Sequence, residues 1–262
     1  FVERQKWARL TNRKPATAID GPRLHPHDRS AMTQPAALPE ASITVHQFGT
    51  EREPVVQIDG FSGQVDALLA QGRAAAYGPA GAYYPGLRAP VKPDYLVPRN
   101  AMMAEIMRRV FGFGQSLRCE AASFSLVTLA PGDLSPSQRI PHYDDTGPGI
   151  IAVMHYLLGP ESGGTAFYRH RRTGFETITP ARKPAYHAAL VRDDLEYGAP
   201  GGGYHYGDSD RYEMIGEIEA APDRMILYRG RLLHSGVIPT PAELSEDPAK
   251  GRLTINMFLE GA

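Results

Sequence analysis

The stretch Pro141-His142-Tyr143-Asp144-Asp145 places an imidazole and a carboxylate two residues apart. In a β-strand, residues two apart project from the same face, so His142 and Asp144 could bind one cation from one side. Tyr143 and Asp145 would point to the opposite face and are not expected to be ligands. The alternative is a solvated pair at a strand end, because a histidine and an aspartate often fall two apart by chance.

A second histidine, His234, follows an apolar strand-like segment at 225–228 and a turn that contains glycine. Two histidines and one carboxylate, with the other metal positions open, form the site of non-haem Fe(II) oxygenases. Further on, Arg252 and Thr254 open another predicted strand and would share one face of it. An arginine there could bind a carboxylate through two donors, with the threonine hydroxyl as a third. The alternative for Arg252 is a surface arginine at the start of an edge strand.

Four short motifs stand in the order found in the 2-oxoglutarate/Fe(II)-dependent oxygenases. They are His142-x-Asp144, then Tyr156-Leu157-Leu158 with Gly163-Gly164-Thr165-Ala166-Phe167, then Leu233-His234-Ser235-Gly236, then Gly251-Arg252-Leu253-Thr254. Over residues 120–260 the chain resembles this superfamily, and most nearly its prolyl-4-hydroxylase-like branch.

The resemblance implies a mainly β fold, a double-stranded β-helix (cupin-like jelly roll) with helices packed on the larger sheet. It implies iron bound by His142, Asp144 and His234. It also implies 2-oxoglutarate as co-substrate, its far carboxylate held by Arg252 and Thr254. Tyr156 is a further candidate, as a hydroxyl donor to 2-oxoglutarate.

The activity implied by the resemblance is an O₂-dependent hydroxylation of an amino acid, a peptide or another small molecule, with release of succinate and CO₂. Related halogenases carry a small residue in place of the carboxylate ligand, so the presence of Asp144 favours hydroxylation. Two other classes stay open: a cupin-like metalloenzyme that does not use 2-oxoglutarate, and a degenerate metal-free binding module.

The interval from Asp144 to His234 spans 90 positions (234 − 144), more than a minimal core of this type needs. It contains a predicted helix at 181–195, opened by Thr179-Pro180, and then a segment rich in glycine and tyrosine. We predict that residues 170–213 form a lid-like insert, in which Tyr204 and His205 contact the substrate. The alternative is a surface excursion without a role in binding.

Residues 1–40 are rich in proline and polar residues and lack apolar periodicity, so we predict a mobile tail followed by a single domain at 41–262. His25 and His27 lie in this tail, where a mobile segment is a poor place to hold metal geometry. Strands are predicted at 42–48 and 54–59.

Helices are predicted at 62–77, capped by Ser62, and from Asn100, as its cap, to Phe111, both packed on the outside of the larger sheet. The segment between them, residues 78–93, is rich in glycine and proline and is predicted to be a long loop. Tyr84 and Arg88 in this loop are candidates for substrate contact. The alternative is a loop that only crosses the barrel surface.

The composition excludes several classes of protein. Lys and Arg number 28 and Asp and Glu 29, so the net charge of −1 does not favour binding to nucleic acid. The single cysteine, Cys119, excludes an internal disulfide and a cysteine-based zinc site. No apolar run approaches the ~20 residues of a membrane span, and the start lacks the apolar region of a secretory signal. These features predict a cytoplasmic protein that does not interact with membranes.

Overall fold

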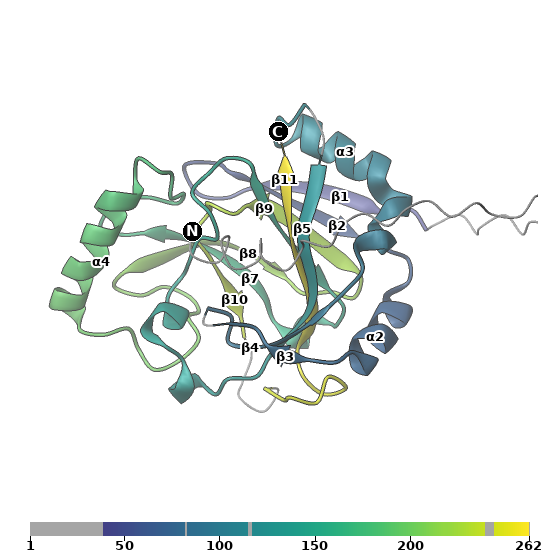
Figure 1. Ribbon diagram of the computed structural model, residues 1–262. Coiled ribbons are helices and arrows are strands. Elements are labelled where there is room, and N and C mark those ends of the chain that lie inside the picture. Colours follow the sequence, from purple (N-terminus) through teal and green to yellow (C-terminus); the bar gives the residue numbers. More distant parts are fainter. Residues whose placement is uncertain (1–38, 82, 115–116, 239–243, 262) are drawn as a thin grey trace, which may run out of the picture. The chain divides into compact units, whose positions relative to one another are not determined.

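The structure, a computed structural model, describes residues 39–261 except 82, 115–116 and 239–243, and this part contains two antiparallel sheets (Figure 1). The larger sheet has the strand order β1-β2-β9-β6-β11-β5-β4-β3, and the smaller sheet has the order β10-β7-β8. The strands are β1 (Ser42–Gln47), β2 (Pro54–Asp59), β3 (Gly78–Pro79), β4 (Gly86–Pro90), β5 (Leu117–Val127), β6 (Ile150–Tyr156), β7 (Gly164–His170), β8 (Tyr212–Glu219), β9 (Arg224–Arg229), β10 (His234–Val237) and β11 (Leu253–Gly261).

Within the described residues, three α-helices accompany the sheets: α2 (Val65–Ala74), α3 (Asn100–Arg109) and α4 (Lys183–Tyr197). Short 3₁₀ helices lie at Pro93–Arg99, Pro131–Asp133, Pro136–Arg139 and Pro160–Ser162. None of the helices that the structure describes combines the length and the apolar composition that crossing a membrane requires.

The strand order from β5 onwards is that of a double-stranded β-helix. Strands β5, β6, β9 and β11 lie in the larger sheet, and β7, β8 and β10 lie in the smaller one. A bridge between His142 and His234 adds the segment around residue 142 to the free edge of β10. The chain therefore crosses repeatedly between two facing sheets, and the predicted jelly roll is confirmed.

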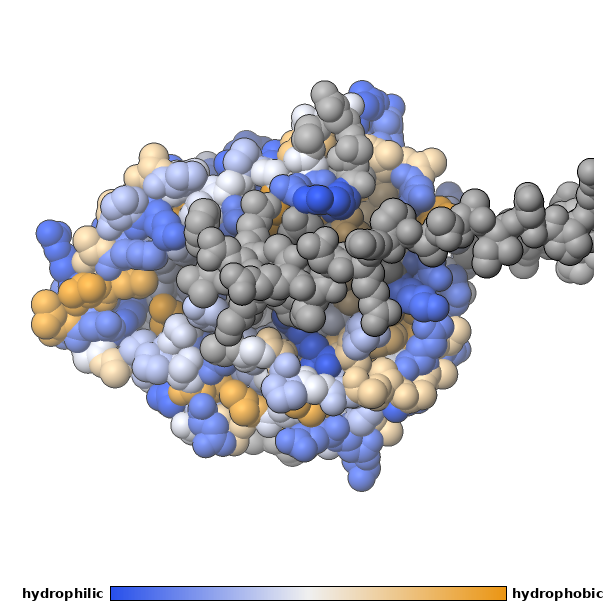
Figure 2. Space-filling model, viewed as in Figure 1, coloured by the Kyte–Doolittle hydropathy of each residue, from blue (hydrophilic) through white to orange (hydrophobic). Residues whose placement is uncertain are grey.

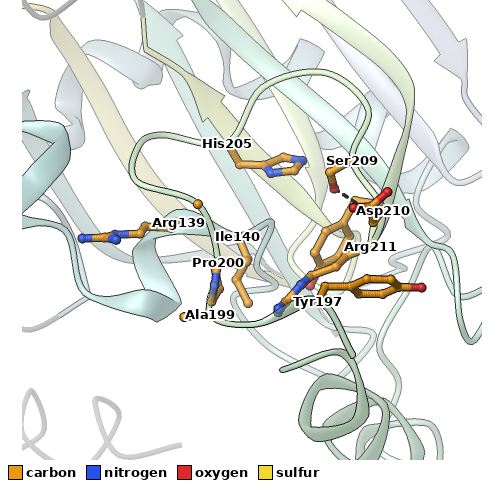
Figure 3. Close-up of a pocket in the computed structure, with 11 residues that line it drawn as sticks. Arg139, Ile140, Tyr197, Ala199, Pro200, His205, Ser209, Asp210 and Arg211 are labelled. Carbon is orange, nitrogen blue, oxygen red and sulfur yellow. Dashed lines mark hydrogen bonds between the residues drawn. The ribbon is translucent and has the colours of Figure 1, made fainter. Parts of the chain in front are cut away.

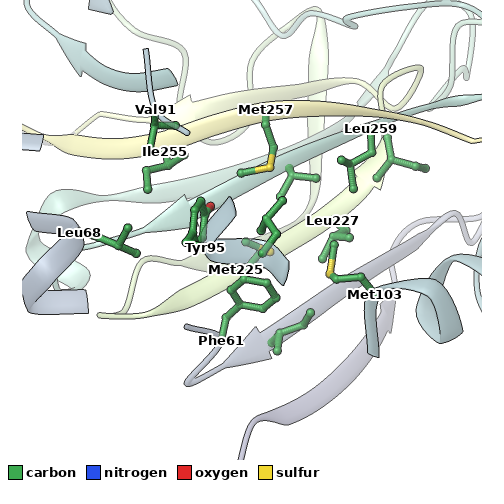
Figure 4. Close-up of a cluster of buried hydrophobic side chains, with 14 of the residues drawn as sticks. Phe61, Leu68, Val91, Tyr95, Met103, Met225, Leu227, Ile255, Met257 and Leu259 are labelled. Carbon is green, nitrogen blue, oxygen red and sulfur yellow. The ribbon is translucent and has the colours of Figure 1, made fainter. Parts of the chain in front are cut away.

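Alternation along β11 shows how the larger sheet divides the interior. The odd-numbered residues from Leu253 to Leu259 pack against helix residues such as Leu68 of α2 and Met103 of α3 (Figure 4). The even-numbered residues face the smaller sheet, where Phe258 packs in a cluster with Phe167 of β7. The two helices therefore cover the outer face of the larger sheet, as predicted, and the inner face carries an apolar cluster together with polar side chains such as Thr254.

Paired glycines open β7 because the chain there passes close to another strand. Gly163 has a φ of 94°, and a Cβ on Gly164 would lie 2.3 Å from the main-chain oxygen of Ile218 in β8. That distance leaves no room for a Cβ atom, so only glycine fits at position 164. This agrees with the close backbone approach that glycine allows at a strand start.

Several predicted boundaries were wrong. Residues 78–93 are not only a loop, because β4 pairs with β5, from Gly86↔Val127 to Pro90↔Ser123. Proline and glycine disfavour strands locally, but β4 lies near the edge of the sheet, where they are tolerated. Ser62 does not cap α2, and Asn100 is already inside α3, where it follows a 3₁₀ helix. The segment around His142 forms an isolated bridge and not a full strand.

A buried hydrogen-bond network around Asp223 joins the start of β9 to β6 and to the turn before α2. The carboxylate of Asp223 accepts hydrogen bonds from the Ser62 amide (2.9 Å), the Ser62 hydroxyl (2.6 Å) and the Gly63 amide (2.7 Å). The ring of His155 donates a further bond of 2.9 Å. Burial opposes ionisation, but the bonds from His155 and Ser62 outweigh it and lower the pKa of Asp223 to about 2. This contact sets where β9, the strand before His234, begins.

We expect Asp223→Asn to lower the free energy of unfolding by about 2 kcal/mol at pH 7, because several charge-assisted bonds are weakened. Asparagine tolerates the φ of 60° at this position, so the change tests the charge and not the backbone. The contribution is present above the ordinary pKa of 3.8 and is lost as the pH falls toward 2, so the deficit of the variant should shrink in acid. Urea unfolding at pH 7 and at pH 3 measures the loss of stability at each pH. Asp66→Asn, on the exposed first turn of α2, is the control. An equal deficit at both pH values would contradict this account.

Candidate metal centre

Main-chain hydrogen bonds bring His142 and His234 together. The His142 amide donates to the His234 carbonyl (2.8 Å), and the His234 amide donates to the His142 carbonyl (2.9 Å). The centroids of the two imidazole rings lie 4.3 Å apart. The amide of Asp144 donates to the carbonyl of Gly230 (2.7 Å), so the residue that follows β9 holds the aspartate as well. The three predicted ligands are therefore positioned by main-chain pairing between segments about 90 residues apart.

The ligand atoms of these residues converge. One ligand atom from each of His142, Asp144 and His234 lies within 4.8 Å of the other two. Nε2 of His234 is 3.5 Å from Oδ2 of Asp144, and Nε2 of His142 is 3.9 Å from Oδ1 of the same carboxylate. The His234 side chain is 6% exposed and that of His142 is 53% exposed, so one imidazole is buried while the other faces outward.

The protonation of both imidazoles suits a metal. Burial lowers the pKa of His234 to about 4. Loss of solvation and the neighbouring His234 lower the pKa of His142 to about 4 as well. Both rings are therefore neutral at pH 7, as metal ligands must be. Nδ1 of His234 donates to the Leu232 carbonyl (2.8 Å), which leaves the lone pair on Nε2, the nitrogen turned toward Asp144. Two neutral imidazoles and one carboxylate fit a divalent first-row metal such as Fe(II).

Arg252 directly precedes β11, and its side chain lies on the inner face. Its guanidinium contacts the start of β7, at a distance from the level of His234. Arg252 is 4% exposed, and it donates from Nε to the Ser162 carbonyl (2.7 Å) and from Nη2 to the Gly164 carbonyl (3.2 Å). Phe167 pairs with His234, and Gly164 pairs with Val237. The three residues from Gly164 to Phe167 correspond to about 10 Å along β7. The surface alternative for Arg252 was therefore wrong, because the guanidinium is buried inside the barrel.

Thr254 and Tyr156 lie beside Arg252, on neighbouring strands. They pair directly across β11 and β6. The Thr254 hydroxyl donates to Oδ1 of Asn256 (2.9 Å), and the Tyr156 hydroxyl shares a bond of 2.7 Å with that of Thr165. Burial raises the pKa of Tyr156 to about 12, and the positive charge of Arg252 opposes this shift. The sequence prediction missed Asn256, although its spacing of two from Thr254 places it on the same face.

Three of the four predicted substrate residues also surround Arg252. The charges of Arg252 and Arg88 act on the phenol of Tyr84, whose pKa burial nevertheless raises. The hydroxyl of Tyr204 donates to the Leu129 carbonyl (2.8 Å). The phenol of Tyr84 and the guanidinium of Arg252 are close enough to influence its ionisation. Residues from β4, from the insert and from β11 thus meet at one place on the inner face.

His205 points elsewhere, although it is adjacent to Tyr204. Its ring packs against Tyr168 (4.9 Å) and Tyr212 (5.5 Å), which belong to the cluster on the outer face of the smaller sheet. There it lines a pocket of about 160 Å³ together with Arg139, Ile140 and Arg211 (Figure 3). The structure therefore does not bring His205 to the inner face with the other predicted substrate residues.

The predicted insert is anchored to that outer face. Helix α4 is held by the buried pair of His170 with Asp193, whose Nε2 and Oδ2 atoms lie 2.7 Å apart. On its other side Val191 and Leu195 are 61% and 84% exposed, and hydrophobic surface is visible over this helix (Figure 2). His25 and His27 of the predicted tail lie outside the described residues.

Comparison with solved structures finds proteins with a similar fold. SnoN, described as a non-heme α-ketoglutarate-dependent epimerase from nogalamycin biosynthesis, is 16% identical with a TM-score of 0.49, over 81% of this chain and 80% of that one. HygX from Streptomyces hygroscopicus, with nickel, 2-oxoglutarate and hygromycin B bound, is 14% identical with a TM-score of 0.46, over 81% and 84%. The collagen prolyl hydroxylase of Paramecium bursaria Chlorella virus-1, a 2-oxoglutarate complex, is 14% identical with a TM-score of 0.41, over 79% and 96%.

Each of these descriptions names the co-substrate that the sequence motifs imply, but likeness of this degree assigns no activity to the present chain. No curated protein matches the sequence. A family match covers residues 39–259, and the chain accordingly belongs to the family described as "Family of unknown function (DUF6445)".

Proposed function

We propose that the protein is an Fe(II)- and 2-oxoglutarate-dependent dioxygenase that hydroxylates an amino acid, a peptide or another small molecule. The observation that carries the proposal is the convergence of His142, Asp144 and His234, whose ligand atoms lie within 4.8 Å of one another. Chance clusters of titratable groups are usually solvated, whereas here paired main chains hold the residues and one imidazole is buried.

His142, Asp144 and His234 would hold the iron, which when bound supplies the activation of O₂ coupled to conversion of 2-oxoglutarate to succinate and CO₂. The protein would keep the ligand atoms deprotonated and correctly oriented for the metal. The low pKa of both imidazoles keeps their lone pairs available, and the Leu232 carbonyl orients the ring of His234. Asp144 adds the negative charge that favours a divalent ion.

Arg252 would bind the far carboxylate of 2-oxoglutarate, with Tyr156 and Thr254 beside it. No residue in the described part of the chain offers Arg252 a carboxylate, although its guanidinium is buried. A buried, unpaired charge is costly, so an anionic partner from outside the chain would be stabilised there. The separation of about 10 Å from the level of His234 along β7 suits a short diacid that spans both positions.

A second class stays open because the guanidinium already donates to the carbonyls of Ser162 and Gly164. These bonds are also what a structural arginine would make. In that case the protein would be a metalloenzyme of the same fold that does not use 2-oxoglutarate. The affinity for 2-oxoglutarate separates the two classes.

The segment 170–213 would act as a partial lid. Its anchored part, α4, rests on the outer face, whereas Tyr204 reaches the surroundings of Arg252 on the inner face. Glycines at 201–203 precede Tyr204 and would allow this tyrosine to move when a substrate binds. His205, which packs on the outer face, would stay in place and serve as the pivot of that movement.

We expect alanine at His142, Asp144 or His234 to weaken binding of Mn(II), a redox-inert substitute for Fe(II), by at least about 100-fold. The electron paramagnetic resonance signal of free Mn(II) measures the affinity without requiring activity. His187→Ala removes an exposed histidine that contacts Tyr143 on the opposite face, and this control should bind Mn(II) like the wild type. Unchanged affinity in the double variant His142→Ala/His234→Ala would exclude this metal centre.

The affinity for Mn(II) should stay nearly constant between pH 8 and pH 6. Protons compete for an imidazole only near its pKa, which is about 4 for His142 and for His234, so binding should weaken as the pH falls below 5. The same titration, repeated at each pH, measures this profile. A marked loss already between pH 7 and pH 6 would show that the imidazoles keep the ordinary pKa of 6.5.

Arg252→Ala should weaken 2-oxoglutarate binding to the Mn(II)-loaded protein by roughly 100-fold, because charge-assisted bonds to the carboxylate are lost. The affinity for Mn(II) itself should be unchanged. Calorimetric titration measures the affinity for 2-oxoglutarate. Arg108→Ala, which removes an exposed arginine of α3, is the control. If the wild type does not bind 2-oxoglutarate, the class that does not use this co-substrate is selected. If Arg252→Ala binds it like the wild type, Arg252 is excluded as the site of the carboxylate.

A further inference from the structure

A row of polar side chains crosses four strands on the inner face of the larger sheet. Arg88 of β4 pairs with Ser125 of β5, Ser125 pairs with Thr254 of β11, and Thr254 pairs with Tyr156 of β6. Residues paired across neighbouring strands project from the same face. Arg88 therefore lies on the same face as the two residues that accompany Arg252.

The guanidinium of Arg88 is oriented by an aromatic ring, but its Nε donor lacks a hydrogen-bond partner among the described residues. Its Cζ atom lies 4.3 Å from the centroid of the Tyr84 ring, a cation–π contact that orients the group. Nε of Arg88 is buried. The hydroxyl of Tyr84 is also buried, and the Ser125 side chain lies near it. A buried donor that is left unpaired is costly, because it loses its hydrogen bonds to water without replacement. Unsatisfied groups of this kind are rare in native proteins and often mark functional sites.

The charges on this face point to a missing anion. Arg88 and Arg252 both act on the phenol of Tyr84, so the two cations share its surroundings. The described part of the chain supplies a carboxylate partner to neither of them. The far carboxylate of 2-oxoglutarate would compensate only one of these cations.

We propose that Arg88 and Tyr84 form a second anion subsite, which receives a carboxylate group of the substrate. Nε–H of Arg88 and O–H of Tyr84 are both donors, and a carboxylate, which only accepts hydrogen bonds, matches them. The substrate class is thus a carboxylate-bearing molecule, such as an amino acid or the free carboxyl end of a peptide. This inference rests on the proposed function, because it assigns Arg252 to 2-oxoglutarate and Arg88 to the substrate.

The test uses acetate as the probe of a carboxylate and acetamide as its neutral match. Protein loaded with Mn(II) and saturated with 2-oxoglutarate is titrated with each, and binding is followed by calorimetry. We expect acetate to bind at least tenfold more tightly than acetamide. Arg88→Gln should weaken acetate binding at least tenfold while changing 2-oxoglutarate affinity by less than about twofold. Tyr84→Phe should weaken acetate binding by a smaller factor, and Arg108→Gln on α3 should behave like the wild type.

Three outcomes would overturn the inference. Equal binding of acetate and acetamide would show that no anion subsite is present. A loss of 2-oxoglutarate affinity in Arg88→Gln as large as in Arg252→Ala would show that both arginines hold one carboxylate. Loss of acetate binding in Arg88→Gln but also in Arg108→Gln would indicate a general effect of charge.

Failure of the proposed function would look different. In that case the wild type would not bind 2-oxoglutarate at all. Acetate and acetamide titrated into the protein without 2-oxoglutarate would still show whether Arg88 selects the anion. Arg88→Lys, which keeps the charge without the planar guanidinium, and a melting temperature for each variant separate loss of the subsite from loss of the fold.

Discussion

The pair of main-chain hydrogen bonds between His142 and His234 is the constraint on which the candidate centre depends. These bonds attach an irregular segment to the edge of the smaller sheet, and the carbonyl of Gly230 then holds the amide of Asp144. Backbone groups buried at a sheet edge require partners, so the pairing that closes the barrel also gathers the three side chains. The ligands are thus placed by the rigid part of the fold and not by a flexible loop.

The alternation of side chains along each strand decides which of them face the interior between the two sheets, where the candidate site lies. On β11, odd-numbered residues complete the apolar core beneath α2 and α3, while Arg252, Thr254 and Asn256 face the smaller sheet. On β7, Thr165 and Phe167 face inward, while Tyr168 packs outward beneath the insert. In the irregular segment before β8, Tyr204 and His205 also point to different faces, although no strand is formed there. Because the outer face of the larger sheet is buried beneath helices, the polar and charged side chains of β11 lie on its inner face, beside an apolar cluster.

Charge is distributed unevenly within this interior. The candidate metal centre contributes one carboxylate and two neutral imidazoles, whereas Arg252 and Arg88 contribute positive charge farther from it. Neither arginine has a carboxylate partner in the part of the chain that is described. By contrast, Arg169 and Arg172 near the insert are paired with Glu176 and Asp193. This difference supports the proposal that the inner face binds anionic ligands.

From the sequence alone, the ordered motifs predicted the double-stranded β-helix through their resemblance to a known superfamily, and the structure confirms this fold. The two-residue spacing of His142 and Asp144, a local property of the chain, indicated them as candidate ligands on one face. It also indicated Arg252 and Thr254 as neighbours on one face. Only the tertiary structure decided that residues 86–90 form a strand, since their pairing with β5 overrides the local preference of glycine and proline. Tertiary packing likewise decided that Arg88 joins Arg252 while His205 does not. Contacts between distant strands are set by burial and register, which no single segment of sequence encodes.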